Sequence, residues 1–344
     1  MAFQFSTGFD FYTTPTQVWD TLSGGSVTIS SASARFGGSH SQGCAFGANA
    51  FVTKGLTGTP TTVIVGFAIK ATTLPTGGNI GELVRINDGG TVQAALGVGS
   101  TGTLQFYRST PTANPIGTSG STPFAANVWH FLEVQVTVNN TTGDAKCWLD
   151  GVQVINSSSN LNTRQSANTQ ATSFSIGNIS GGLITVADDV YCFDGTGGSL
   201  NAPLGDRRII TRMANGPGSF SQFTPTGAAA NWQCVDEIPA NDNTDYVADS
   251  TVNDRDSYTY ESVTFNGNAD FVVQWARLSK DDAGAHTVQL SVTDTGNDAF
   301  SSSIAVPSSY AYVNGGALTS SPNGGAAWSQ TVINRTEFGI KIIS

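Results

Sequence analysis

The sequence predicts an all-β protein in which a two-sheet sandwich is followed by a second, smaller β domain. Residues 128–138 alternate between an apolar side and a mixed side, which is the period of a strand with one face in a core. Asp150-Gly151 separates two further strand-like runs, and Asp-Gly in this setting predicts a type I′ hairpin. The 344 residues include 40 glycines and plentiful Ser, Thr and Asn, a composition typical of many short strands and tight turns. Only 12% of the residues are charged, so the surface must be made polar by hydroxyls and amides.

The expected strands can be read in order along the chain. Residues 61–70 predict the best buried strand, because they are β-branched and nearly all apolar. The runs 128–138, 145–149 and 152–155 predict three consecutive antiparallel strands, and residues 183–193 predict the last strand of the first region. We expect no helix longer than two turns.

The domain boundary is expected where glycine, serine and proline accumulate. Residues 194–205, DGTGGSLNAPLG, are the best linker candidate. We therefore expect a sandwich over 1–200 and a C-terminal β domain over 201–344 that serves attachment or self-association. In this second region, residues 270–279 and 286–293 predict a hairpin.

The charge of the chain argues against two classes of partner. A net charge of −10 disfavours binding to nucleic acid and to anionic membranes, since both need clustered Lys and Arg. The chain has no apolar run of membrane-spanning length, and its start lacks the basic region of a signal peptide. The four cysteines are widely spaced, which favours buried free thiols and leaves one disulfide possible; they are Cys44, Cys147, Cys192 and Cys234.

No motif predicts catalysis or a cofactor. Residues 97–102 match GxGxxG, but a strand-like run follows them, so a hairpin turn is expected instead of a nucleotide loop. Glu133 is a lone carboxylate, whereas glycosidases need a positioned pair. The loop 236–256 has seven acidic residues; a solvated loop is favoured there, and calcium binding stays open. We expect no catalytic residue, no cofactor and no metal ligand.

Five segments between residues 35 and 193 resemble the concanavalin A-like, laminin-G-type lectin/glucanase sandwich. They are, in order, RFGG at 35–38, TTVIVGFAIK, WHFLEVQVTV, KCWLDGV and ADDVYCF. The resemblance implies a jelly-roll sandwich. The E-x-D-x-x-E pattern of the sandwich glucanases is absent, so their catalytic carboxylates do not carry over.

Other segments resemble tailed-bacteriophage virion structural proteins, in which a lectin-like sandwich precedes a second β region. They are GFDFY with the nearby Trp19, LGDRRI at 204–209, VDEIPANDNTDYV at 235–247 and AAWSQTVINRTEFGIKI at 326–342. This resemblance implies a protein that is made in the bacterial cytoplasm and is later exposed on the particle.

Two functions follow from these resemblances as expectations. The first is a non-enzymatic virion structural protein, either a capsid decoration or a tail appendage, that forms a homo-oligomer bound to other virion proteins. The alternative is a receptor-binding tail protein, such as a tail fibre, that recognises host surface glycans. Glycan stacking is assigned to Trp19, Phe106 and Tyr107. Assembly is assigned to Trp328, Phe338, Ile340 and Ile342, for which a strand that completes the core is the equally plain alternative.

Overall fold

The computed structural model describes residues 3–111, 115–121 and 123–344. The chain divides into two compact units, Met1–Ile210 and Thr211–Ser344, ten residues beyond the division placed at 200. Regular structure is almost entirely β strand, and the one α-helix in the described ranges is α1 (Gln330–Arg335). The expectation of no helix longer than two turns is therefore confirmed for these residues. No described helix has the length and apolarity that crossing a membrane requires.

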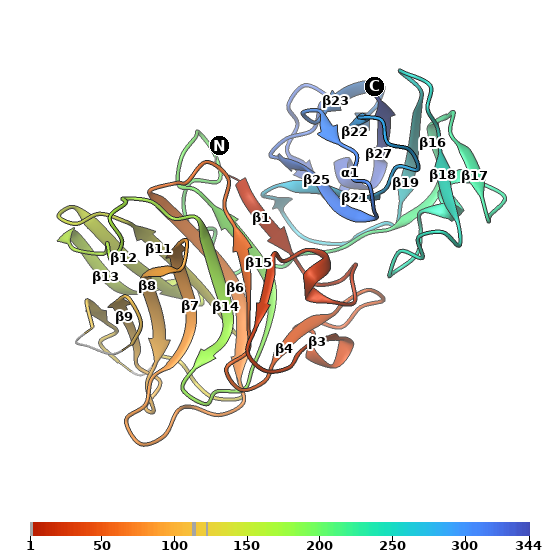
Figure 1. Ribbon diagram of the computed structural model, residues 1–344. Helices are drawn as coiled ribbons and strands as arrows, with labels where there is room; N and C mark the ends of the chain where they lie inside the picture. Colours follow the sequence, from red (N-terminus) through yellow and green to blue (C-terminus); the bar gives the residue numbers. More distant parts are fainter. Residues whose placement is uncertain (1–2, 112–114, 122) are drawn as a thin grey trace. The chain divides into compact units, whose positions relative to one another are not determined.

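The first unit is a sandwich of two antiparallel sheets (Figure 1). Sheet A contains β1 (Phe3–Thr7), β3 (Val27–Ser30), β4 (Gly43–Phe46), β6 (Thr62–Ala71), β11 (His130–Thr137), β12 (Gly143–Leu149), β13 (Val152–Leu161) and β15 (Thr185–Phe193). Its strand order is β13-β12-β11-β6-β15-β4-β3, and β1 also pairs with β15. Sheet B contains β2 (Thr21–Ser23), β5 (Phe51–Gly55), β7 (Gly81–Asp88), β8 (Thr91–Val98), β9 (Leu104–Arg108), β10 (Gly117–Thr118) and β14 (Ser173–Ser180). Its order is β10-β9-β8-β7-β14-β5-β2, so the predicted two-sheet sandwich is confirmed.

Strand β11 lies inside sheet A, between β12 and β6. Leu132, Val134 and Val136 have no exposed surface and face the core between the sheets. Glu133, on the other face of the strand, also has no exposed surface. The alternating sequence predicted a single buried face, and the structure shows that the other face is also buried at Phe131 and Glu133 and partly exposed at Gln135 and Thr137. The strand begins at His130, two residues later than predicted.

Two predicted turns have the expected form. Asp150 and Gly151 have φ angles of 53° and 78°, the positive pair of a type I′ turn, and they join β12 to β13. The GxGxxG segment at 97–102 joins β8 to β9, which pair as an antiparallel hairpin. Gly102 has a φ of 81°, and a Cβ there would lie 2.1 Å from the carbonyl oxygen of Phe124. Glycine at 102 therefore serves the turn.

The second unit is built on one sheet with a two-stranded ribbon beside it. Sheet C contains β16 (Ala214–Ser221), β19 (Arg255–Tyr260), β22 (Thr287–Asp294), β23 (Asn297–Phe300), β24 (Ile304–Ala305) and β27 (Glu337–Ile342). Its order is β16-β19-β27-β22-β23, and β24 also pairs with β22. The ribbon is β21 (Val272–Leu278) paired with β25 (Ala311–Leu318). The smaller strands form two further pairs, β17 (Thr224–Thr226) with β18 (Tyr246–Ala248) and β20 (Asn268–Ala269) with β26 (Trp328–Ser329).

One predicted hairpin in this unit is wrong. The sequence predicted that residues 270–279 pair with 286–293, but β21 pairs with β25, and β22 pairs with β23 and β27. The loop KDDAG does lie between the two strands, yet each strand finds a partner further along the chain. Nearness in sequence favoured the wrong pair, because the partner of β21 comes only after β22, β23 and β24, while β22 forms its hairpin with the next strand, β23.

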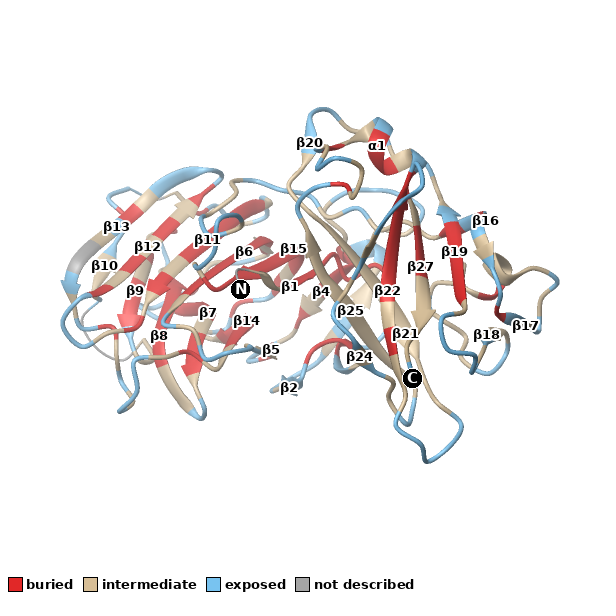
Figure 2. Cartoon of the chain, turned by 90° about the horizontal axis from the view of Figure 1, so that it is seen from above, coloured by how far each residue is buried: buried red, intermediate tan, exposed pale blue. Residues whose placement is uncertain are grey.

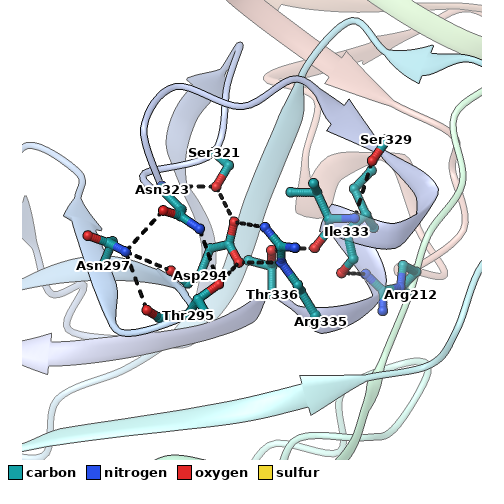
Figure 3. A network of polar contacts seen from close by, with 11 residues as sticks. Arg212, Asp294, Thr295, Asn297, Ser321, Asn323, Ser329, Ile333, Arg335 and Thr336 are labelled. Carbon is teal, nitrogen blue, oxygen red and sulfur yellow. Dashed lines mark hydrogen bonds and ion pairs between the residues drawn. The ribbon is translucent and has the colours of Figure 1, made fainter.

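A buried carboxylate connects β22 to α1 in the second unit (Figure 3). Asp294 has no exposed surface, and Arg335, the last residue of α1, donates to its Oδ1 at 2.6 Å and to its Oδ2 at 3.0 Å. The hydroxyls of Ser321 and Thr295 also donate to this carboxylate. The Arg335 guanidinium, together with these hydroxyls, lowers the pKa of Asp294 to about 2. The paired and hydrogen-bonded charge fixes the end of the helix on the sheet.

Candidate functional site: the covered face of sheet A

The candidate site is the face of sheet A that points away from sheet B, around Glu133. The core face of β15 and β1 can be identified because the ring of Phe5 contacts Phe174 of sheet B, with centroids 6.2 Å apart. Phe5 pairs with Cys192, and Cys192 pairs with Val65, so these residues share the core side. Residues one step along each strand therefore lie on the opposite face.

Glu133, Gly66 and Tyr191 form a row across three neighbouring strands of that opposite face. The Tyr191 hydroxyl donates to Oε1 of Glu133. A Cβ on Gly66 would lie 2.3 Å from the Tyr191 ring. The missing side chain at 66 thus allows Tyr191 to lie over β6 and reach β11. Burial and the nearby Glu133 carboxylate raise the pKa of Tyr191, which keeps its proton available for this bond.

A segment of the chain that follows the last strand of the sandwich closes this row. We call residues 204–209 the covering segment. The backbone N–H of Leu204 donates to the Tyr191 hydroxyl at 3.0 Å, and the N–H of Gly205 donates to Oε1 of Glu133 at 2.9 Å. Further along, the N–H of Ile209 donates to Oδ1 of Asp189 at 2.7 Å. Backbone donors of the covering segment therefore bond to side chains of β11 and β15.

Arg35 also binds the covering segment, through its guanidinium group. Its guanidinium lies 2.6 Å from Oδ2 of Asp206 and 3.4 Å from Oδ2 of Asp189. It also donates to the carbonyl oxygen of Arg207 at 3.2 Å. The ring of Phe131 lies 5.6 Å from the guanidinium carbon, within the range of a cation–π contact. Arg35 thus bridges the covering segment and a carboxylate of β15.

Two adjacent carboxyl groups lie beneath Arg35 at an irregularity in β15. The pairing of β15 with β6 shifts between Asp188 and Tyr191, and Asp189 has a φ of 53°. Burial and the neighbouring Asp189 charge raise the pKa of Asp188 to about 8. Burial also raises the pKa of Asp189, to about 6, although Arg35 opposes this shift. Asp188 accepts the backbone N–H groups of Arg35 and of Asp189.

These carboxyl groups predict a pH dependence of stability. A carboxyl group whose pKa is higher in the folded chain binds more protons when folded, so the free energy of unfolding falls as pH rises between the two pKa values. For Asp188 that window runs from about 4, the unfolded value, to about 8. We expect the sandwich to unfold at a lower temperature at pH 8 than at pH 5, in thermal scans at constant ionic strength.

The matched variant for this prediction is Asp188→Asn, which keeps the size of the side chain and cannot ionise. The amide has one acceptor oxygen in place of two, so either the backbone N–H of Arg35 or that of Asp189 loses its acceptor. The variant should therefore be less stable than the native chain at pH 5. Its stability should nevertheless change less between pH 5 and pH 8. An equal slope in both proteins would show that Asp188 does not cause the dependence.

The three aromatic residues expected to stack on sugars are buried. Trp19 is 2% exposed, Phe106 1% and Tyr107 4%. Trp19 stacks on Phe9 with ring centroids 6.0 Å apart, and its indole N–H donates to the Tyr12 hydroxyl at 3.1 Å. The expectation that these three rings are exposed for glycan binding is therefore wrong. They were chosen for residue type, and type alone does not separate a binding ring from a core ring.

The residues expected to mediate assembly lie in and beside the core of the second unit. Trp328 has no exposed surface and Phe338 is 6% exposed, and both belong to one hydrophobic cluster with Val292, Val332 and Ile333. Ile340 and Ile342 are half-buried. Strand β27 pairs with β19 on one side and β22 on the other, so it is not an open edge. The structure thus places Trp328 and Phe338 in the core, and the terminal strand completes the sheet.

The structure also places the cysteines and the acidic loop. The four cysteines are buried free thiols, the alternative that the sequence favoured. Within the described residues, no three His, Cys, Asp or Glu side chains come together as a metal site. In the acidic loop, Asp242 instead pairs with Arg277.

Sequence reasoning singled out Glu133 but missed what surrounds it. Arg35 and Gly205 lie far from Glu133 along the chain, and neither belongs to a pattern that indicates contact with β11. The available signal was the pair Asp188-Asp189 in an otherwise apolar strand, since adjacent carboxyl groups in a buried strand require partners. Those partners come from the covering segment and from Arg35.

Comparison with known proteins gives low similarities. No family model matches the chain, and no curated protein sequence matches it. The cellulose-induced protein Cip1 is similar at 20% identity and a TM-score of 0.40, over 55% of this chain and 96% of that one. Domain 4 of AbnA, a GH43 extracellular arabinanase from Geobacillus stearothermophilus, in complex with arabinotriose, is similar at 12% identity and a TM-score of 0.36, over 56% and 90%. Trypanosoma rangeli sialidase in complex with the inhibitor DANA is 13% identical at a TM-score of 0.34, over 49% of this chain and 27% of its own.

The strand order and register of this chain define its class. It is an all-β protein whose first unit is a two-sheet antiparallel sandwich and whose second unit is a smaller β domain. The chain spans about a quarter of the sialidase and nearly all of Cip1 and of the AbnA domain.

Replacing Tyr191 with Phe should destabilise the sandwich and loosen the covering segment. The variant removes the donor to Glu133 and the acceptor for the N–H of Leu204 while keeping the ring. We expect a loss of about 1–3 kcal/mol in the free energy of unfolding, because Glu133 stays buried with fewer partners. Amide hydrogen exchange should become faster at Leu204 and Gly205 and stay unchanged in β7 and β8. Unchanged exchange at 204–205 would contradict the role of Tyr191 in fixing this segment.

Proposed function

We propose that this chain is a non-enzymatic structural protein of a bacteriophage particle that displays a lectin-like sandwich. The observation that carries the non-enzymatic part is the state of Glu133. This carboxylate, central on its face of sheet A, has no exposed surface and bonds to Tyr191 and Gly205 of its own chain. A hydrolase needs a carboxyl pair that reaches substrate and water, whereas Glu133 is enclosed by its own chain.

Two of the segments that resemble virion proteins stabilise the fold itself. Residues 204–209 are the covering segment that fixes the chain on the sandwich just before the second unit begins. Residues 326–342 contain β26, α1 and β27, which supply Trp328 and Phe338 to the core of the second unit. These roles support a structural protein, because residues 204–209 bond to the sandwich and residues 326–342 supply the core of the second unit.

The proposal includes assembly with other particle proteins. Only 12% of the residues are charged, so packing against neighbours removes few charges from water. Particle proteins recur in symmetric copies, and closed symmetry is the usual form of a homo-oligomer. We propose a homo-oligomer that is made in the bacterial cytoplasm, binds other virion proteins and is exposed on the particle as a capsid decoration or a tail appendage.

Two measurements test this proposal. Labelling of purified particles with an antibody against the chain, viewed by electron microscopy, should show it at regular positions on capsid or tail. The purified chain should release no reducing sugar ends from host surface polysaccharide. Release of sugar by the native chain, lost in the matched variant Glu133→Gln, would overturn the non-enzymatic assignment. Absence of the chain from particles would overturn the virion assignment.

A further inference from the structure

The ribbon of β21 and β25 presents one face to the core of the second unit and the other face away from it. Val272 and Leu318 pair directly and pack against the cluster that contains Trp328. Gln274, two residues along from Val272, donates to the carbonyl oxygen of Gly339 in sheet C at 2.7 Å. The side that carries Val272 and Gln274 is therefore the inner one. Trp275 and Arg277 lie at the alternate positions and belong to the outer face.

The outer face carries a cluster of aromatic rings around one guanidinium. Arg277 pairs with Tyr312 across the ribbon, and its guanidinium carbon lies 5.0 Å from the ring centre of Tyr312 and 5.6 Å from that of Tyr310. Trp275 precedes Arg277 by two residues on the same face and pairs with Asn314. Three aromatic side chains and an arginine thus share one small surface of the second unit.

Hydrogen-bonding groups from the acidic loop border these rings. Asp242 binds Arg277 through both carboxylate oxygens, with Oδ2 at 2.8 Å from a terminal guanidinium nitrogen. The Tyr310 hydroxyl donates to Oδ1 of Asn243 at 3.1 Å, and Asn243 is exposed. Asp242 has a φ of 55°, a conformation that costs energy outside glycine and that the paired guanidinium helps to hold. Asp242 and Asn243 thus form a polar border that hydrogen bonds to Arg277 and Tyr310 fix in position.

The cluster is partly exposed, and its cation is paired with Asp242. Strands β21 and β25 are half-buried along their whole length, whereas β22 is mostly buried (Figure 2). The Asp242 side chain is 35% exposed and that of Arg277 is 15% exposed. Because Asp242 neutralises Arg277, the surface offers ring faces and hydrogen-bonding groups around a neutral ion pair. That combination matches a neutral ligand with flat C–H faces and many hydroxyl groups.

We propose that this outer face, formed by Trp275, Arg277, Tyr310 and Tyr312 with Asp242 and Asn243, is a binding site for a neutral oligosaccharide. A pyranose ring stacks its C–H face on a tyrosine or tryptophan ring. Its hydroxyl groups bond to the free lone pairs of Asp242 and to the amide of Asn243. A charged ligand is disfavoured, since the single cation of the cluster already has its partner. The inference stands apart from the virion proposal, because a structural protein needs no glycan site.

The test is binding of the chain of residues 1–344 to a glycan array that displays neutral α- and β-linked hexose oligosaccharides. The best array ligand is then titrated by isothermal calorimetry. We expect saturable binding that weakens about tenfold or more in Tyr310→Ala and in Asp242→Asn, a factor that corresponds to about 1.4 kcal/mol. The matched control is Phe300→Ala, which removes an aromatic ring that is 40% exposed elsewhere in the same unit. That variant should bind as the native chain does.

Folding of each variant is checked by circular dichroism and thermal unfolding. Tyr310→Phe provides a milder change, which keeps the ring and loses the hydroxyl bond to Asn243. It should weaken binding by less than Tyr310→Ala. Binding to none of the neutral oligosaccharides overturns the proposal, and so does binding that Tyr310→Ala and Asp242→Asn leave unchanged. A chain that is present on particles but fails this test leaves the virion assignment intact, so the two failures are distinguishable.

Discussion

Replacing Val134 with Asp should unfold the sandwich at temperatures where the native chain is folded. Val134 has no exposed surface and lies on the core face of β11, between Val65 on β6 and Cys147 on β12. A carboxylate there is surrounded by apolar side chains and has no cation to pair with. The cost of burying such a group is several kcal/mol, which is comparable to the whole stability of a domain.

The measurement is urea unfolding followed by tryptophan fluorescence, with Gln135→Asp as the matched control. Gln135 is the next residue of β11 and points to the other, partly exposed face. It pairs with Lys146 on β12, so a new carboxylate there has a cation nearby. Gln135→Asp should change the free energy of unfolding by less than about 1 kcal/mol. Equal losses in the two variants would show that the core face of β11 is wrongly assigned.

The architecture of the first unit could be predicted because its signals are local. Alternation over 128–138 locates β11, and the Asp150-Gly151 pair sets the type I′ turn between β12 and β13. Each of these features depends on a few neighbouring residues and on backbone preferences. The same local reasoning identified the glycines of 97–102 as a hairpin turn, which the pairing of β8 with β9 confirms.

The candidate site could not be predicted in the same way, because it depends on contacts between distant residues. Glu133 reads as a solvent-facing carboxylate of an amphipathic strand, and only residues 204–209 show that its face is covered. Trp19 reads as a candidate binding ring, but its indole lies against Phe5 and Phe9. The pairing of β21 with β25 was missed for a related reason, since the nearer run 286–293 also matched the hairpin pattern. Residue type and the spacing of apolar residues indicate which side chains can be buried. Contacts with distant parts of the chain decide which side chains are buried.

Replacing Trp328 with Ala should strongly destabilise the second unit. The oligomeric state of the variant is a separate measurement. The indole has no exposed surface, and its N–H donates to the carbonyl oxygen of Leu318 at 2.7 Å. Removing it leaves a cavity against Val292 and Phe338 and takes the indole donor from the partly buried carbonyl oxygen of Leu318. Both losses act in the same direction, and we expect about 3–5 kcal/mol of lost stability.

The matched control is again Phe300→Ala, because Phe300 is an exposed ring of the same unit and its removal should cost less than about 1 kcal/mol. Thermal unfolding gives the stability, and sedimentation velocity below the unfolding temperature gives the mass in solution. A folded Trp328→Ala chain of normal stability and reduced mass would show that Trp328 acts in assembly and not in the core. A chain of lowered stability whose folded fraction keeps the native mass would place assembly on other surfaces. That second result is expected, because Trp328 is enclosed by its own unit and has no surface left to offer a partner.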